Sequence, residues 1–310
     1  MSRTRWLPYA TLAGGVAVVS VASILIRYAH LEGAASLTIA ALRMSFAALL
    51  LAPFAWPRAR RELPTLSRAD LLLVGAAGLV LAAHFAAWIT SLEYTSVASS
   101  AVLVTTNPVW VGLLSWIVLR ERPGLGVFAG IVLGLLGSAL VFVAGQGTAP
   151  DPQHAPLLGN ALALGGAVAV SVYLLIGRRL RTRVSLWTYV FLVYSTAAVA
   201  LLLAALVAGA SLWPTPAACG LILLLAAGPQ LLGHTAFNHA VRHLPAPLVA
   251  VAILGEPIGA AALAWLLFGE AVNALQLAGF GLLLVGIVLA AVTESRRASL
   301  APANPVPAGR

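Results

Sequence analysis

The sequence contains no lysine, one cysteine and only nine acidic residues among its 310 positions. Charged residues make up 9% of the chain, whereas a soluble domain carries about 25%. So few charges cannot cover a water-facing surface, which excludes a soluble globular fold. The single cysteine, Cys219, excludes a disulfide framework and a cysteine-based metal site. We interpret the absence of lysine as genome composition, because the abundant alanine, glycine, proline and arginine share GC-rich codons.

Hydrophobic residues make up 61% of the chain, which excludes intrinsic disorder and predicts a polytopic membrane protein. A spanning helix needs about 20 mostly apolar residues, and short breaks with turn-forming or charged residues separate ten such stretches. The first is longer than the apolar region of a signal peptide and lacks a convincing cleavage site, so we expect it to remain as a membrane helix. The predicted spans are 8–29, 35–56, 69–91, 94–119, 124–144, 157–177, 185–208, 217–240, 245–268 and 272–292.

The positions of the arginines predict the orientation of the chain. If the N-terminus is cytoplasmic, every arginine except Arg27 and Arg43 lies in a cytoplasmic segment, as the positive-inside rule requires. We therefore expect both termini on the cytoplasmic side of a cell membrane, with a bacterial inner membrane as the favoured location. The net charge of +9 does not indicate a nucleic-acid partner, because the arginines lie between apolar spans and form no patch with exposed aromatic residues.

The chain repeats itself at a shift of 149 to 151 residues. The aligned pairs run in order and include types that are rare in apolar helices: Arg27 with Arg178, His84 with His234, Asn107-Pro108 with Glu256-Pro257, Trp116 with Trp265, Glu121 with Glu270, Gly130 with Gly279 and Gly137 with Gly286. Each half holds five spans, and because five is odd the halves enter the membrane in opposite directions. We therefore predict an all-α integral membrane fold of ten transmembrane helices arranged as two inverted five-helix repeats.

The repeat defines the predicted organisation of the chain. We expect a cytoplasmic N-terminus, a first repeat with spans one to five, a linker, a second repeat with spans six to ten, and a disordered cytoplasmic tail rich in proline, alanine and serine. These segments cover residues 1–7, 8–144, 145–156, 157–292 and 293–310, respectively.

One motif marks the fourth and ninth spans. A proline is followed by a tryptophan after seven intervening residues and by a glutamate after four more, at 108–121 and again at 257–270. Arg43 lies in the stretch Leu-Thr-Ile-Ala-Ala-Leu-Arg-Met. Over residues 8–292 these features resemble the EamA family of the drug/metabolite transporter superfamily. The resemblance implies ten helices in two inverted halves and an activity as exporter or permease for amino acids and other metabolites.

From this resemblance we expect a secondary transporter that exports a small metabolite, with an amino acid favoured, by alternating access. A drug or cationic-metabolite effluxer is the alternative within transport. An intramembrane enzyme is not expected, because it would need a second carboxylate, or a nucleophile and base, at the depth of Glu256. No nucleotide-binding motif is present, and no cofactor is expected. The expected partners are the small-molecule substrate, with proton coupling as an option, and the lipid bilayer, and we expect a monomer or a weak dimer.

Two charged residues lie well inside predicted spans. Glu256 is the only acidic residue there, and a carboxylate at the bilayer centre must face a polar cavity, pair with another group or become protonated. It is therefore a candidate for substrate binding and proton transfer, or a structural group bonded to Arg43 or to backbone near Pro257. Arg43 is permanently charged and needs a partner, either Glu256 or a helix C-terminus. The family resemblance implies a structural or gating role for Arg43.

Polar and aromatic residues on four spans are candidates for the lining of a substrate cavity. Residues four apart share a helix face, and tryptophan, histidine and asparagine could bind a zwitterionic or aromatic molecule. Each histidine could instead form an interhelical hydrogen bond that only holds helices together. No carboxylate or cysteine joins the histidines at ligand spacing, so no metal is expected. The candidates are His84, Trp88, Asn107, Trp110, Tyr173, His234 and Asn238, in addition to Glu256.

Prolines and glycines inside the spans predict local backbone features. Pro108 and Pro257 occupy matching repeat positions and should kink their helices, either for gating or as a fixed packing feature. A GxxxGxxxG stripe at 126–134 should permit close helix packing. Glu121 and Glu270 lie just past their spans, and we expect each to cap or orient the start of the helix that follows.

Overall fold

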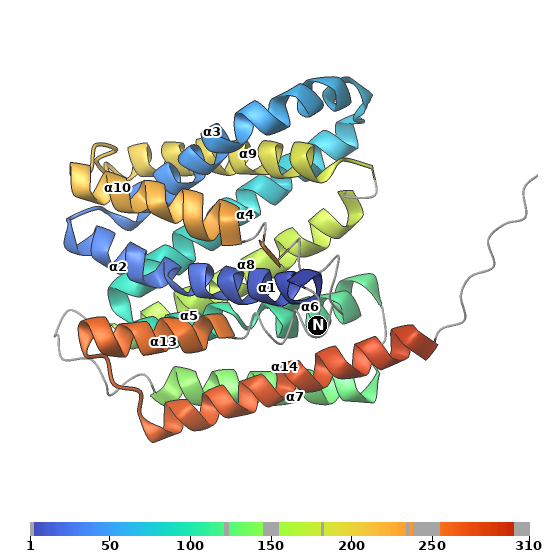
Figure 1. The fold of residues 1–310 in the computed structure, drawn as a ribbon, viewed down its shortest axis with the longest axis vertical. Coiled ribbons are helices and arrows are strands. Elements are labelled where there is room, and N and C mark those ends of the chain that lie inside the picture. The colour runs from blue at the N-terminus through green and yellow to red at the C-terminus, as the bar shows by residue number, and fades with distance from the viewer. Residues whose placement is uncertain are drawn as a thin grey trace, which may run out of the picture.

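A computed structural model describes residues 3–120, 124–144, 155–180, 183–233, 236–237 and 255–300. Every regular element in these ranges is helical, and the helices lie side by side across the molecule (Figure 1). The first half comprises α1 (Arg3–Ser20), α2 (Ala22–Leu31), α3 (Ser36–Glu62), the short η1 (Leu63–Thr65), α4 (Arg68–Tyr94), α5 (Val97–Val104), α6 (Asn107–Leu119) and α7 (Leu125–Ala144). The second half comprises α8 (Pro156–Leu180), α9 (Leu186–Val207), α10 (Pro216–Leu225), the π-helical η3 (Ala226–Gly233), α13 (Gly255–Phe268) and α14 (Ala274–Leu300).

These elements confirm the predicted number of spans, and the end of the eighth and the start of the ninth lie outside the described residues. Eight helical segments of the described ranges are long and apolar enough to cross a membrane, and two shorter apolar helices, Gly255–Phe268 and Ala274–Ala290, match the ninth and tenth. The first, fourth and eighth spans each join two elements: α1 with α2, α5 with α6, and α10 with η3. The last helix continues to Leu300, so the first part of the tail predicted to be disordered, residues 293–300, is helical instead.

Hydroxyl side chains set the start of several spans. Ser67, Ser96, Ser185 and Thr215 each precede a helix and accept a hydrogen bond from the backbone N–H three residues later. Such a cap satisfies one of the N–H groups that the first helical turn leaves unpaired. At α14, Asn273 plays this part: its side chain accepts from the backbone N–H of Gln276, and the Gln276 side chain accepts in return from the backbone N–H of Asn273.

Contacts between connecting segments divide the bundle into two ends. At one, which we call the Glu270 end, Glu270 pairs with Arg27 and joins α2 to the segment after α13. At the other, the Glu62 end, the Glu62 carboxylate accepts from the backbone N–H of Ser185 at 3.0 Å and joins α3 to α9. These contacts place the connections after α2, α4 and α13 at one end and those after α3 and α8 at the other, as expected of a chain that crosses a membrane repeatedly.

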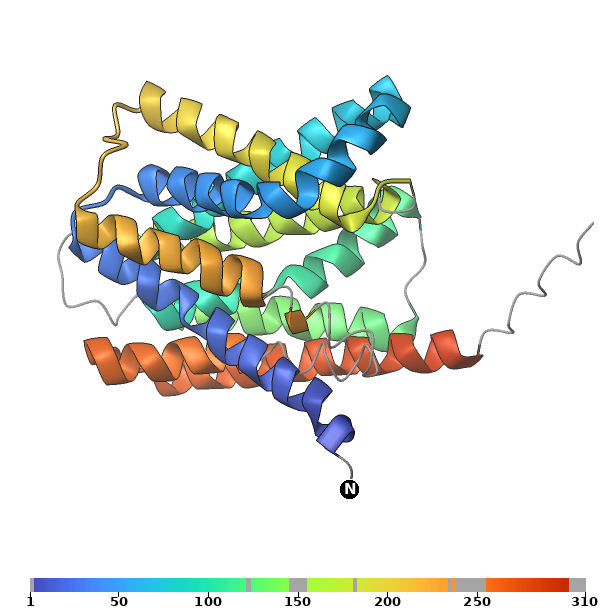
Figure 2. The same cartoon turned by 45° about the horizontal axis from the view of Figure 1, so that its top comes forward.

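The two halves pack about an approximate two-fold relation. The second spans of the halves, α3 and α9, contact each other, as do the fifth spans, α7 and α14. The contact of α4 with α8 is matched by that of α10 with α2, and the contacts of α5 and α6 with α8 by those of α13 with α1 and α2. Figure 2 shows α1 running obliquely past α13. Contacts that correspond in this way are expected of an inverted repeat.

The closest helix contact joins α7 and α14 through glycines. A methyl group placed on Gly130 would lie 2.5 Å from the carbonyl oxygen of Gly286, and one on Gly137 would lie 2.7 Å from that of Gly279. These two contacts map onto each other under the sequence repeat. The predicted glycine stripe is thus confirmed as a close-packing surface, and its partner is the last helix of the same chain.

The fourth span is broken rather than kinked. The helix ends at Val104, a turn follows at Thr105 and Thr106, and α6 begins at Asn107 with Pro108 in its first turn. Proline is tolerated there because its missing N–H would have no intrahelical acceptor. In the eighth span, Pro229 lies inside the π-helical η3, where the ladder of hydrogen bonds is altered in a way that hydropathy does not reveal.

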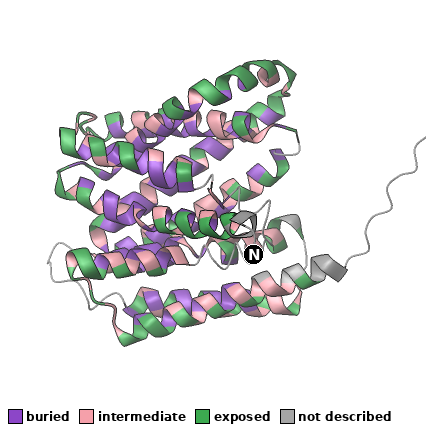
Figure 3. Ribbon diagram, viewed as in Figure 1, coloured by how far each residue is buried: buried purple, intermediate pink, exposed green. Residues whose placement is uncertain are grey.

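Buried residues lie toward the centre of the bundle, and exposed residues lie on its outer surface (Figure 3). Fully buried residues from both halves, such as Ile39, Ile89 and Ala260, form one core cluster, while large apolar side chains such as Leu72 and Leu203 are exposed. In water such exposure would be costly, whereas hydrocarbon chains accept it. The described helices therefore present an apolar exterior that suits a bilayer.

The ion pair at the Glu270 end gives a first testable prediction. Glu270 Oε1 lies 2.7 Å from Arg27 Nη2, and Oε2 accepts from the backbone N–H of Val97 at the start of α5, also at 2.7 Å. The Arg27 and Glu270 side chains are only 19% and 15% exposed. The substitution Glu270→Gln should therefore lower the free energy of unfolding by about 1–3 kcal/mol. Thermal unfolding of the purified protein in detergent measures this change as a lower midpoint.

The matched control for this prediction is an exposed pair at the opposite end. Arg183 lies 3.4 Å from Asp70, but its side chain is 65% exposed, so water screens the attraction. Arg183→Gln should leave the unfolding midpoint unchanged. Equal midpoints for the two variants would show that the Glu270 contact does not stabilise the bundle.

Candidate functional site

A buried polar chain crosses the centre of the bundle between α3, η3 and α9. Nη2 of Arg43 donates to Gln230 Oε1 at 2.7 Å, and Gln230 Nε2 donates to the hydroxyl oxygen of Tyr194 at 2.5 Å. All three side chains are buried, and Arg43 is only 2% exposed. The sequence predicted Glu256 or a helix C-terminus as the hydrogen-bonding partner of Arg43, and the structure supplies the Gln230 side chain instead. A charged group at this depth is costly and points to a functional centre.

Aromatic residues of α4 form one wall around this guanidinium. The central carbon of Arg43 lies 4.4 Å from the ring centroid of Phe85 and 5.4 Å from that of Trp88. Both distances suit cation–π attraction, which is strengthened where water is excluded. His84 extends the wall, because its ring is stacked at 6.0 Å from Trp88. Neighbouring residues of α4 thus place aromatic faces on one side of the positive charge that α3 contributes.

The His84 ring also forms an interhelical hydrogen bond. Its Nδ1 lies 2.8 Å from the carbonyl oxygen of Gly166 on α8, so Nδ1 carries the proton when it donates there. The helices lie close together here, since a methyl group at Gly166 would be in van der Waals contact with the backbone of α4. The bond fixes the ring beside Trp88 and ties the third span to the sixth.

Glu256 faces the same core from α13. It is half-buried, and it lies on the helix stripe of Ala260 and Ala264, which are fully buried in the core cluster. Its carboxylate and the Arg43 guanidinium attract each other electrostatically, although no direct ion pair joins them. The two opposite charges that the sequence singled out therefore lie within electrostatic reach of each other inside an apolar bundle.

Other predicted lining residues lie on neighbouring helices. The carbonyl of Asn107, the first residue of α6, accepts from Ser171 at 3.1 Å. One turn on, the indole N–H of Trp110 donates to Thr106 at 2.9 Å, within the same span. Tyr173 stacks against Tyr189 of α9 with ring centroids 6.1 Å apart. His234 and Asn238 lie outside the described residues.

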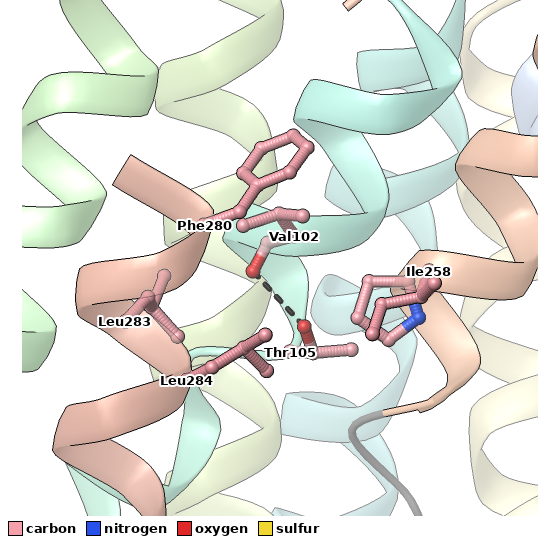
Figure 4. Close-up of a pocket in the computed structure, with 7 residues that line it drawn as sticks. Val102, Thr105, Ile258, Phe280, Leu283 and Leu284 are labelled. Atoms are coloured by element: carbon pink, nitrogen blue, oxygen red, sulfur yellow. Dashed lines mark hydrogen bonds between the residues drawn. The ribbon is translucent and has the colours of Figure 1, made fainter. Parts of the chain in front are cut away.

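The two repeat prolines have different surroundings. Pro108 is exposed, whereas Pro257 is buried and borders a small apolar cavity between α5, α13 and α14 (Figure 4). The cavity volume is about 20 Å³, which is room for roughly one water molecule. Thr105, at the break of the fourth span, also lines the cavity, and its hydroxyl is engaged with the carbonyl of Val102 at 3.0 Å. The remaining lining residues are Ile258, Phe280, Leu283 and Leu284.

Two side chains that matter here were not identified from sequence. Gln230 and Tyr194 lie in strongly apolar stretches. The only feature of the sequence that could have identified them is the amide of Gln230 next to Pro229, a polar group inside a membrane span. Glu270 was expected to cap the helix after it, but it binds the backbone at the start of α5 instead. No group of three histidine, cysteine or acidic residues close enough to hold a metal occurs within the described ranges.

These features define a class of protein. Ten apolar spans in two inverted halves, with opposite charges held between them, are the architecture of a multi-pass membrane transporter. The model of the EamA-like transporter family matches residues 6–143 and 157–292, one match for each half. The chain belongs to this family, within the drug/metabolite transporter superfamily, whose members are transporters rather than enzymes.

Individual relatives are more distant. An uncharacterized transporter of Archaeoglobus fulgidus is 25% identical over 83% of this chain and 87% of its own length. The uncharacterized transporter YwfM of Bacillus subtilis is 24% identical over 70% of this chain and 72% of its own length. The uncharacterized transporter YetK of the same organism is 29% identical over 30% of this chain and 28% of its own length. A protein of known crystal structure superposes on 96% of this chain over 99% of its own chain, with a TM-score of 0.59. Because the two sequences are only 22% identical, this likeness concerns the fold alone.

Proposed function

We propose that this transporter exports a small zwitterionic metabolite, with an amino acid favoured, by alternating access. The observation that carries the proposal is the pair of opposite charges, Arg43 and Glu256, inside an apolar bundle and without a direct ion pair between them. Separated charges of this kind are costly unless a substrate or ion completes them. A zwitterion carries both complementary groups in one small molecule.

The proposed substrate cavity lies between the two halves, near the broken fourth span. Trp88 and the neighbouring aromatic wall support it, because a flat apolar surface beside a buried charge suits an amphipathic ligand. Arg43, Pro108 and Pro257 are proposed to act in gating as well. The proposed lining comprises His84, Trp88, Asn107, Trp110, Tyr173, His234, Asn238 and Glu256.

Glu256 is proposed to couple substrate movement to protons. A carboxylate in this position can hold either a proton or the ammonium group of the substrate, but not both. Proton binding would then release the substrate, and the proton would move in the direction opposite to the cargo. With both termini in the cytoplasm, as the arginine distribution favours, this exchange would export the cargo across a bacterial inner membrane.

Transport in liposomes tests the proposal. The purified full-length protein is reconstituted, and labelled amino acids are followed with and without an imposed proton gradient. We expect at least one neutral amino acid to accumulate against its own gradient when the proton gradient is present. Movement of other metabolites, with no amino acid transported, would contradict the choice of cargo.

Efflux of a cationic drug or metabolite is the second candidate, and the carboxylate of Glu256 favours it. A monovalent organic cation would pair with Glu256 alone, and it would offer no negative group to Arg43. Liposomes loaded with tetraphenylphosphonium distinguish the two candidates. Proton-driven release of this cation, at a rate that amino acids do not reduce, would support the cation effluxer.

A further inference from the structure

Three buried N–H donors beside the polar chain have no acceptor among the residues that the structure describes. Nε and Nη1 of Arg43 and Nε1 of Trp88 are all shielded from solvent and form no hydrogen bond within the described part of the chain. A buried donor without a partner is strongly unfavourable, and more so when it belongs to a charged group. Three such groups close together are therefore an unusual feature for a core that is otherwise well packed.

The neighbouring groups cannot readily supply the missing acceptors. Gln230 already uses its carbonyl oxygen on Nη2 of Arg43 and its amide nitrogen on Tyr194. Phe85 and Trp88 offer only ring faces to the guanidinium. The local chemistry is thus a permanent positive charge and N–H donors, fixed in direction by a hydrogen bond on one side and aromatic rings on the other.

A carboxylate is the ligand that fits this chemistry. It accepts several hydrogen bonds, it carries the complementary charge, and its planar shape matches paired N–H groups of a guanidinium. An organic cation would be repelled by Arg43, and a neutral polar group would leave the charge uncompensated. A ligand that also carries an ammonium group could reach Glu256 with its other end.

We propose that Arg43 and the Trp88 indole N–H bind the carboxylate of the substrate. Arg43 is then a substrate-binding residue and not merely a structural or gating one, and Trp88 is a hydrogen-bond donor as well as an aromatic surface. This assignment rests on the proposed export of a zwitterion, which it deepens by giving each charged end of the substrate a separate partner. The substrate class it selects is an α-amino acid with a free carboxylate.

Ligand binding to the purified full-length protein in detergent tests the assignment without measuring transport. The probes are the twenty standard amino acids, each compared with its α-carboxamide, which keeps the side chain and the amino group but loses the negative charge. We expect at least one amino acid to raise the unfolding midpoint while its carboxamide does not. If a carboxamide stabilises the protein as well as its amino acid, or if no amino acid stabilises it, the assignment is wrong.

Two variants place the carboxylate on the named residues. Trp88→Phe keeps an aromatic ring but removes the N–H donor, and it should weaken binding of the amino acid about tenfold. Arg43→Gln should abolish the preference for the amino acid over its carboxamide, and Arg43→Lys should restore part of that preference because it restores the charge. Trp187→Phe, the same change at an exposed tryptophan of α9, is the matched control and should bind as the wild type does.

The results separate this assignment from the proposed function. Selective binding of an amino acid that is lost in Arg43→Gln, with no transport in liposomes, would leave the carboxylate site standing and refute export. Transport of an amino acid with an unchanged carboxylate preference in both Arg43→Gln and Trp88→Phe would support export and overturn the site. If Arg43→Gln does not fold, the Trp88→Phe comparison alone decides, because unchanged affinity in that variant contradicts the assignment.

Discussion

Gly286→Val is expected to reduce strongly the amount of folded protein that accumulates. A methyl group at Gly286 would lie 2.7 Å from the carbonyl oxygen of Gly130 and 2.8 Å from the backbone nitrogen of Gly134. These are backbone atoms of α7, so no side-chain rotation can relieve the overlap, and α14 must move away. Overpacking costs typically about 1–3 kcal/mol, and a clash with backbone lies at or above the upper end. The loss takes a large part of a total stability of about 5–15 kcal/mol.

Size-exclusion chromatography of a fluorescent fusion in detergent measures this effect as loss of the symmetric folded peak. Gly286→Ala should show an intermediate loss, because it adds only the first clashing atom. Gly281→Val is the matched control on the same helix, since a methyl group there meets nothing within 4 Å. A folded peak for Gly286→Val equal to that of Gly281→Val would show that α7 and α14 do not depend on close approach.

The glycine contact also illustrates what the sequence can predict about this fold. The repeat aligned Gly130 with Gly279 and Gly137 with Gly286, and the glycine pattern indicated close packing. It did not indicate that Gly130 would meet Gly286, since the lipid-facing and packed faces of these helices are almost equally apolar. In water, hydrophobicity marks the buried face of a helix. In a bilayer that difference disappears, so the number and direction of the spans can be predicted but the pairing of helices cannot.

The candidate site was partly predictable for a related reason. A charge inside a membrane span is conspicuous, so Arg43 and Glu256 could be identified directly, and the structure brings them within electrostatic reach. Their neutral partners are not conspicuous. Gln230 reaches Arg43, and Tyr194 reaches Gln230, only because three distant segments meet. The contact of Glu270 with the start of α5 depends on the same kind of long-range approach.

Glu256→Gln is expected to abolish proton-driven accumulation of the substrate, while exchange down a gradient persists with a weaker apparent affinity, because the amide oxygen can still accept from the ammonium group. The amide keeps the size and much of the hydrogen-bonding capacity of the carboxyl group, but it cannot bind or release a proton. A pH difference of one unit supplies about 1.4 kcal/mol per proton, which corresponds to about tenfold accumulation of a cargo exchanged for one proton. The variant should lose this factor. Liposomes with equal internal and external substrate measure it as accumulation after a pH step.

The control is a glutamate outside the bundle core. Glu32 is exposed at the Glu270 end, so Glu32→Gln removes one carboxylate without touching the charged centre, and accumulation should stay at the wild-type level. Two outcomes bear on the role of Glu256. Loss of both accumulation and exchange would show that the substrate does not bind without the charge of Glu256, so that the variant does not test proton coupling separately from binding. Accumulation retained in Glu256→Gln would show that another group carries the proton, because no chemistry of a glutamine side chain can replace it.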